Sequence, residues 1–140
     1  MVFANNVQEC EGGISMPNSD HMSNAFIEVV PLKNMRYPSG DDYFRVSNGM
    51  LHFRITARPD KRHEWLDLQH AQVEQFLCEL RGITIESVDE WDYAHLDTDD
   101  PGSLEGCPYG KEHVFANMIC RQLAKEIEVD FDKYYNEELL

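Results

Sequence analysis

The sequence has no apolar run approaching the roughly 18 residues that a membrane span requires. Its first residues also lack the basic segment and following apolar stretch that are typical of a secretory signal. We therefore expect a cytoplasmic protein without a membrane partner.

None of the cysteines forms a C-x-x-C pair, so the usual zinc-finger and redox spacings are missing. In a cytosol we expect reduced thiols at Cys10, Cys78, Cys107 and Cys120.

The common catalytic motifs are missing as well. There is no G-x-S-x-G elbow, no glycine-rich phosphate loop and no H-E-x-x-H pair, because Ala71 stands where the glutamate of that pair would be. Asp97, Asp99 and Asp100 hint at calcium, but they lack the ligand spacing of a calcium loop and its closing glutamate. No established reaction follows from the motifs.

Positive charge is scarce. Twelve Lys and Arg stand against 26 Asp and Glu, which gives a net charge of −14. Duplex nucleic acid and anionic membranes would be repelled by such a surface, so we expect neither as a direct partner. A basic protein is the partner that this charge favours. The hydrophobic fraction of 42% over 140 residues is sufficient for the core of one domain.

The chain divides into two parts. Residues 1–22 are rich in Gly, Ser, Asn and Pro without periodicity, which predicts a flexible N-terminal arm. Residues 23–140 are predicted to form a single α+β domain. Within it, residues 26–32 form a β-rich run, and residues 43–46 and 50–56 alternate around Ser47-Asn48-Gly49, a strong hairpin signal. We expect a small antiparallel sheet with helices on one face.

Helical periodicity predicts two long helices and one or two short ones. The first long helix spans about 60–81 and is expected to stop at Gly82. A shorter helix is predicted over 86–96. The second long helix spans 112–128, and its apolar residues cover most of its circumference, so we expect it at the centre of the core. The tail, from residue 130, is expected to pack as a short final helix.

The charge is unevenly distributed along the domain. Residues 33–62 contain seven basic residues and three acids, whereas residues 86–105 contain eight acids and no Lys or Arg. A solvated face that keeps the protein soluble is the simpler interpretation. The functional interpretation is a docking surface for a basic partner, with aromatic anchors. The residues expected on it are Asp89, Glu90, Trp91, Tyr93, Asp97, Asp99, Asp100 and Tyr109.

Both long helices carry polar residues of metal-ligating type on their apolar side. His70 and Glu74 are four residues apart and share a helix face, as do His113 and Cys120, seven apart. If the helices pack together, these side chains converge, and Asp92 is expected to hold a ligating imidazole in place or to act as an additional ligand. Imidazole, carboxylate and thiolate suit zinc and related divalent first-row metals. Histidines that are simply hydrogen-bonded in the core are the alternative.

The stretch HAQVEQFLCELRGITIESVDEWD, residues 70–92, resembles the core of an uncharacterised family of small phage and prophage proteins. The family pattern reads HELxExxLC, RGI, VDxFD, PYxxxH and HxxAxxxE, and the chain follows it through Pro108, Tyr109 and His113. The resemblance implies a His- and carboxylate-rich site between the long helices, in a bacterial host's cytoplasm, but no reaction. The chain departs from the pattern at Ala71 and Cys120, where the family has glutamates.

Two functions are consistent with these observations. The first is an acidic phage-type protein that binds a basic partner, as an inhibitor of a host factor or defence system or as a nucleic-acid mimic, with a metal site in its helical core. The alternative is a metal-dependent, hydrolase-like domain that uses His70, Glu74 and His113. Since a bound metal acidifies its water ligand, such a site would allow hydrolysis near neutral pH. The sequence leaves open whether the protein is an enzyme.

Overall fold

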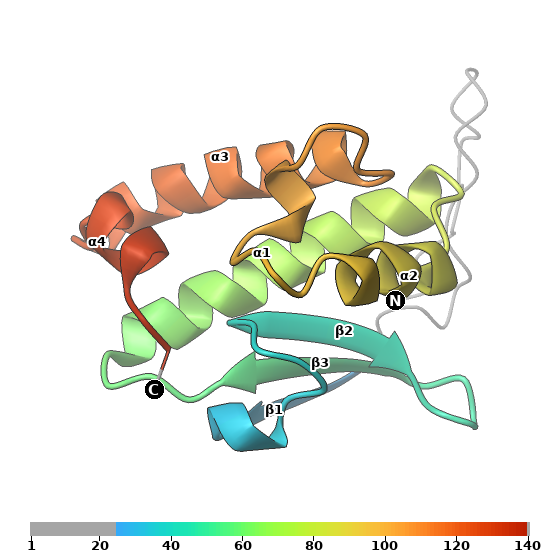
Figure 1. Cartoon of the computed structure of the whole chain (residues 1–140). Coiled ribbons are helices and arrows are strands. Elements are labelled where there is room, and N and C mark those ends of the chain that lie inside the picture. Colours follow the sequence, from blue (N-terminus) through green and yellow to red (C-terminus); the bar gives the residue numbers. More distant parts are fainter. Residues whose placement is uncertain (1–24, 140) are drawn as a thin grey trace, which may run out of the picture.

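The computed structural model describes residues 25–139 and shows the predicted α+β fold. Within these residues, three strands and four helices follow one another, with 3-10 turns at Leu32–Asn34 (η1) and Pro101–Ser103 (η2) (Figure 1). The strands are β1 (Ala25–Val30), β2 (Asp41–Arg45) and β3 (Leu51–Thr56), and the helices are α1 (Lys61–Leu80), α2 (Ile85–Ala94), α3 (Gly110–Glu126) and α4 (Phe131–Asn136). The predicted arm, residues 1–22, lies outside the described residues.

The predicted hairpin is confirmed, but the sheet is mixed rather than antiparallel. β2 pairs antiparallel with β3 across Ser47–Gly49, and Gly49 adopts the positive φ of 82° that such a turn favours. β1 instead runs parallel to β3, with Ala25 opposite Leu51 and Val30 opposite Thr56. The expectation was wrong because β1 and β2, which residues 31–40 connect, are not neighbours in the sheet but are separated by the width of one strand. β3 fills this position, which gives the order β1-β3-β2.

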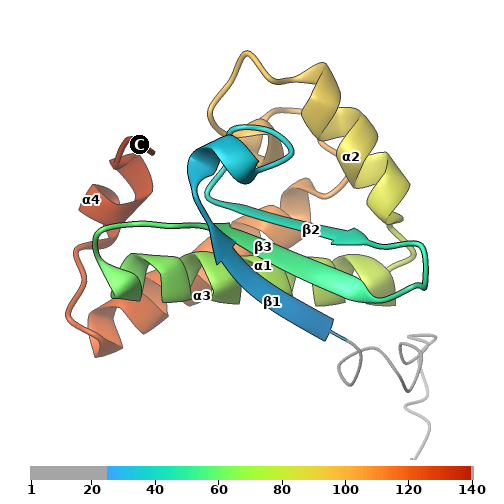
Figure 2. The same ribbon diagram turned by 90° about the horizontal axis from the view of Figure 1, so that it is seen from below.

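The helices lie on one face of the sheet (Figures 1 and 2). On β3, Leu51, Phe53 and Ile55 point to this face and are each only 1% exposed, as the alternation of the strand predicts. α1 crosses the sheet here, and its residue Ala71 packs in one cluster with Leu51 and Phe53. One part of the core therefore lies between the sheet and α1. α3 packs on α1 from the far side, and a second buried cluster, which includes Leu66, Cys120 and Tyr134, lies between α1, α3 and α4.

α1 begins and ends where the sequence predicts. The carboxylate of Asp60 caps its start by accepting a 2.9 Å hydrogen bond from the amide of Arg62, and Gly82, with φ 73°, follows its end. The face that α1 turns towards α3 and β2 is unusually polar, because it carries the buried residues Asp67, His70 and Glu74. Such a face requires partners for each polar group.

α3 is less central than its apolar circumference predicted. Its inner face is buried through Ala116, Cys120 and Ala124, but Val114 and Met118 on its outer face are 62% and 49% exposed. The expectation was wrong because α1 covers only one side of α3, and no other element within residues 25–139 covers the opposite side.

The predicted final helix is present as α4 and is bound to the first half of α1. The hydroxyl of Tyr134 donates a 2.6 Å hydrogen bond to Asp67, whose other carboxylate oxygen lies 2.9 Å from Nε of Arg58. This buried contact holds α4 against α1.

Among the helices of residues 25–139, none combines the length and apolarity that crossing a bilayer requires.

Candidate metal centre

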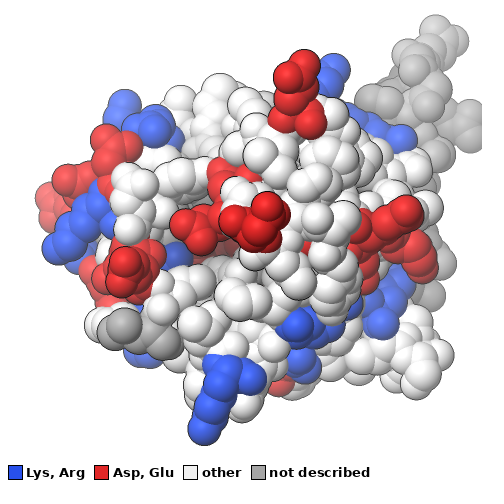
Figure 3. Space-filling view, in the orientation of Figure 1, with Lys and Arg blue, Asp and Glu red and all other residues white. Residues whose placement is uncertain are grey.

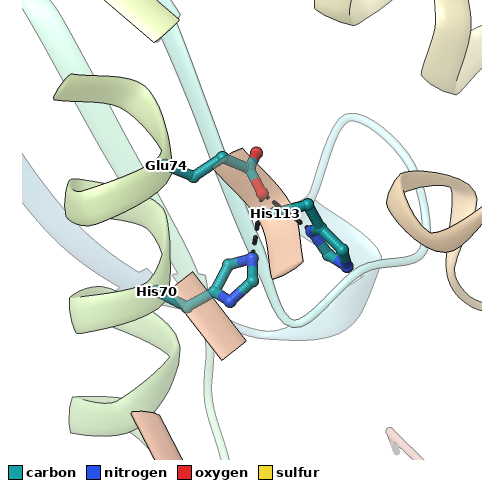
Figure 4. A group of neighbouring side chains, drawn as sticks. All are labelled: His70, Glu74 and His113. Atoms are coloured by element: carbon teal, nitrogen blue, oxygen red, sulfur yellow. Dashed lines mark hydrogen bonds and ion pairs between the residues drawn. The ribbon is translucent and has the colours of Figure 1, made fainter. Parts of the chain in front are cut away.

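Three side chains from the two long helices meet in the interior. His70 and Glu74 lie one turn apart on α1, and His113 comes from the first turns of α3, which packs against α1 at this level (Figure 4). Their potential ligand atoms all lie within 4.8 Å of one another. His70, Glu74 and His113 therefore converge as their spacing predicts, without Cys120 and Asp92, and the group could hold a metal ion.

One carboxylate oxygen joins the two imidazoles. Oε2 of Glu74 lies 3.0 Å from Nε2 of His70 and 2.8 Å from Nδ1 of His113. Because an ionised carboxylate can only accept hydrogen bonds, both ring nitrogens donate when no metal is bound. The second oxygen, Oε1, accepts a 2.8 Å hydrogen bond from the hydroxyl of Tyr43 on β2. All three members of the group are at most 9% exposed, so little water reaches them.

His113 is held from its other side by an acidic residue of the loop before α3. Oδ1 of Asp100 lies 2.8 Å from Nε2 of His113, and the same residue accepts hydrogen bonds from the hydroxyls of Ser103 and Tyr135. The neighbouring Gly102 lies over the imidazole ring and leaves no room for a side chain. Histidine ligands of metals typically contact a carboxylate through the nitrogen that does not face the metal, and Asp100 occupies this place.

These contacts shift the pKa of each group. Burial alone would raise the pKa of Glu74, but the hydrogen bonds from His113 and His70 outweigh it and lower the pKa to about 2. Burial would likewise lower the pKa of His113, yet Asp100 and Glu74 raise it to about 9. The pKa of His70 is raised well above its usual value, against its burial, by contacts with Cys120 and Glu74 and by the charge of Asp41. Without a metal, both imidazoles are therefore protonated at neutral pH.

This arrangement predicts a pH dependence for chelator-treated protein. A raised histidine pKa stabilises the fold fully below the unfolded value of 6.5, and this contribution is lost as the pH rises through about 9. We expect the free energy of unfolding to fall between pH 6.5 and 9.5 by on the order of 3 kcal/mol for His113. Urea denaturation across this range measures it. The His113→Gln variant is the control and should give a flatter profile, whereas an unchanged slope would contradict the assignment.

Two candidate ligands lie outside the group. Cys120 is 1% exposed and donates a 3.4 Å hydrogen bond from its thiol to the carbonyl of Leu66, beside His70. Asp92 accepts hydrogen bonds from the hydroxyls of Tyr37, at 3.0 Å, and of Tyr109. Burial raises the pKa of Asp92 to about 6, and the two phenols limit the rise. Neither side chain belongs to the group whose ligand atoms lie within 4.8 Å of one another. The carboxylate that contacts His113 is that of Asp100, not that of Asp92.

The residues expected on a partner surface are divided between the exterior and the interior. Glu90, Tyr93, Asp97 and Asp99 are exposed on α2 and the loop that follows it. The others make internal contacts. Asp89 pairs with Arg36 at 2.9 Å, Asp100 contacts His113, the indole of Trp91 donates to the carbonyl of Pro101 at 2.8 Å, and Tyr109 is only 4% exposed. The four exposed residues are thus the ones available to a partner.

Sequence reasoning missed two members of the site. Tyr43 lies on a strand whose alternate residues face α1, so strand periodicity could have directed it towards the helix but not to Glu74. Asp100 was assigned to the acidic surface, because a loop residue has no periodicity that shows which way it points.

Comparison with protein-family models, curated proteins and solved structures gives no match for this chain. The resemblance to a phage family therefore stays a prediction.

Proposed function

We propose that the protein is a small metal-binding domain in which His70, Glu74 and His113 hold zinc or another divalent first-row metal. The observation that carries the proposal is the single Glu74 oxygen facing a ring nitrogen of each histidine, with ligand atoms from both long helices within 4.8 Å. Two imidazoles and a carboxylate are a common ligand set for such metals. The carboxylate of Asp100 on the far nitrogen of His113 supports the same proposal.

The separations of the donor atoms agree with a site that loads by exchanging protons for metal. Tetrahedral zinc at about 2.0–2.1 Å from each ligand keeps neighbouring ligand atoms about 3.3 Å apart. The Glu74 oxygen lies 3.0 and 2.8 Å from the two ring nitrogens, which are hydrogen-bond distances. To take up a metal, this oxygen and each nitrogen must move apart by a few tenths of an ångström. They must also release the two N–H protons, so metal binding should acidify an unbuffered solution.

The burial of the group favours a structural centre over a hydrolytic one. Three protein ligands leave one tetrahedral position for water, as in catalytic zinc sites, but a hydrolase also needs access for its substrate, and the three ligating side chains are at most 9% exposed. A metal at this place would cross-link α1 to α3 and so stabilise the fold. The metal-dependent hydrolase remains the alternative, and it requires a movement that opens the site to solvent.

Metal analysis of protein purified without chelator tests the proposal. We expect close to one equivalent of metal per chain, a higher melting temperature for the loaded than for the chelator-treated protein, and loss of both in His113→Ala. Less than a tenth of an equivalent, together with no thermal stabilisation on adding zinc, would leave the three residues as a hydrogen-bonded group without metal.

A second candidate function is binding to a basic protein, and the distribution of exposed charge favours it. Exposed acids follow one another along α2 and its loop at Glu86, Glu90, Asp97, Asp99 and Glu105, and residues 86–105 contain no Lys or Arg. Acidic side chains are visible on this side of the molecule in Figure 3. Following the resemblance to phage proteins, the partner would be a host factor or defence protein whose basic, nucleic-acid-binding groove is blocked.

Charge reversal separates a localised surface from general acidity. With polylysine as the probe, we expect Asp97→Lys with Asp99→Lys to weaken binding at least tenfold, in a salt-sensitive manner. The matched control reverses Glu126 and Asp132, which are exposed on α3 and α4. If the two double variants weaken polylysine binding equally, binding depends on the net charge of the protein, and residues 86–105 are not a docking surface.

A further inference from the structure

β1 is an edge strand, and its outer side has no partner within the described part of the chain. The order β1-β3-β2 places β1 at one edge of the sheet, on the side away from α2 (Figure 2). No strand among residues 25–139 pairs with its outer side. An unpaired edge presents a row of N–H and C=O groups that another chain can join, so this edge is a candidate interaction surface.

The pairing of β1 with β3 shows which backbone groups point outwards. The carbonyl of Val30 accepts a 2.7 Å hydrogen bond from the amide of Ala57, which follows β3, so the backbone groups of Val30 face β3. Because this direction alternates along a strand, the backbone groups of Phe26 and Glu28 also face β3. The N–H and C=O groups that point to the open side are therefore those of Ala25, Ile27 and Val29.

The side chains of β1 make this edge apolar. Ile27 and Val29 lie on the same face of the sheet as the buried Phe53, the face that the helices cover. They are nevertheless 46% and 49% exposed, because α1 packs over β2 and β3. Phe26, on the opposite face, is exposed as well. Exposed apolar side chains on both faces of an edge strand favour pairing with a further strand, which would cover them.

β1 also lacks the usual protection of an edge. Natural edge strands carry charges, prolines or bulges that discourage pairing. The one charged residue of β1 is Glu28, which forms an ion pair with Arg54 of β3 at 2.5 Å. Pro31 follows the strand and does not interrupt it, and the pairing with β3 runs without a bulge. The edge is therefore open to strand addition, a common mode of recognition between chains.

A second copy of β1 is complementary to this edge in one antiparallel register. In a pair centred on Ile27, this residue lies opposite itself and Ala25 lies opposite Val29, so all outward-pointing groups exchange hydrogen bonds. Shifting one copy by two residues would place Glu28 opposite Glu28, and Pro31, which has no N–H, opposite Ala25. The opposite shift leaves Val29 without a counterpart in β1. The centred register is therefore the favoured one.

The charge near this edge allows two copies to approach each other. Each copy carries −14, but residues 33–62, which include β2 and β3, contain seven basic residues and three acids. Basic side chains are visible on the sheet side of the molecule in Figure 3. Because the acidic stretch of residues 86–105 lies on α2 and its loop, beyond the opposite edge of the sheet, repulsion between the copies is weakest with β1 facing β1.

We propose that the protein forms a symmetric dimer in which β1 pairs antiparallel with β1 of a second copy, centred on Ile27. The two sheets then form one continuous sheet, and the partner strand covers Ile27 and Val29. An interface built on one six-residue strand from each copy is small, so we expect a Kd on the order of 100 μM. The proposal does not depend on the metal centre, so its test is run with chelator present as well as without it.

Sedimentation equilibrium of the full chain under reducing conditions tests the dimer. Between about 10 μM and about 1 mM, which brackets this Kd, the mass should rise from 16.3 kDa towards twice that value. Because the two copies repel each other, raising the salt concentration from about 0.05 to about 0.5 M should tighten the dimer. A mass of 16.3 kDa over the whole concentration range, at either salt concentration, would overturn the proposal.

Two variants locate the interface at β1. Ile27→Lys places two like charges opposite each other and should weaken the dimer at least tenfold. Ile27→Pro removes an outward N–H without removing a hydrogen bond to β3, and a similar loss is expected. The matched control is Val114→Lys, the same change of charge at an exposed position of α3, which should dimerise as the wild type does. Unchanged dimerisation in both Ile27 variants would place the interface elsewhere and overturn the assignment.

Amide hydrogen exchange identifies the occupant of the edge. The amides of Ile27 and Val29 should exchange more slowly as the protein concentration rises through the Kd. Those of Glu28 and Val30, which face β3, serve as internal controls and should be protected at every concentration. If the amides of Ile27 and Val29 are equally protected in the monomer, the edge is covered within a single chain and the proposal fails.

Discussion

Replacing Glu74 by glutamine is expected to lower the free energy of unfolding by about 3 to 5 kcal/mol, the range for breaking a buried ion pair. Oε2 of Glu74 accepts from both imidazoles, and Oε1 accepts from Tyr43. The amide of glutamine has one acceptor atom and no charge, so each histidine loses one of the groups that raise its pKa, and His113 keeps only Asp100. We also expect zinc affinity to fall at least 100-fold. Urea denaturation and zinc titration measure these effects.

The control for this variant is Glu126→Gln, the same change near the exposed end of α3. It removes the same charge without touching the buried group, so its free energy of unfolding should stay within about 0.5 kcal/mol of the wild type. If Glu74→Gln unfolds at the same urea concentration as this control, the buried triplet contributes nothing to stability and the account of the site fails.

Gly102→Ala is expected to disturb the site by steric contact alone. A Cβ atom at residue 102 would lie 2.5 Å from Cγ and 2.6 Å from Nδ1 of His113, closer than real Cβ contacts. Because Nδ1 is the nitrogen that faces Glu74, the ring must turn or the η2 turn must lift away from it. We expect a loss of about 1–3 kcal/mol in stability, as for overpacked cores, and at least a tenfold loss in zinc affinity.

Gly110→Ala is the matched control, since the same methyl group would meet Cys107 at 3.6 Å, an ordinary contact. Residue 110 is the first of α3, where alanine is favoured over glycine, so stability should be unchanged or slightly higher. The His113 ring resonances in NMR spectra report the position of the imidazole directly. Unshifted resonances in Gly102→Ala would show that the η2 turn does not fix the ring.

The parts of the structure that follow from local pattern could be predicted from the sequence. Asp60 and Gly82 delimit α1, and Asn48-Gly49 defines the hairpin, because caps and turns depend on neighbouring residues. The spacing of His70 and Glu74 places them on one face of α1, and His113 lies on the inner face of α3. The metal-capable group could therefore be expected as soon as the two helices are assumed to pack together.

The parts that depend on distant residues could not be predicted. The direction of β1 depends on which strand fills the position beside it, and its own alternation does not contain that information. The exposure of Val114 on α3 depends on the extent of α1, which covers only one side of α3. Asp100 contacts His113 because Gly102 lets the η2 turn approach the ring, a three-dimensional fit that no spacing rule describes.

The central claim is that a metal binds where α1 meets α3. An anomalous difference map from crystals of zinc-loaded protein, collected at the zinc absorption edge, tests it most directly. We expect a peak about 2.0–2.2 Å from Nε2 of His70, a carboxylate oxygen of Glu74 and Nδ1 of His113. A map without a peak at this position, or with zinc bound only by the cysteines or by surface carboxylates, would contradict the claim.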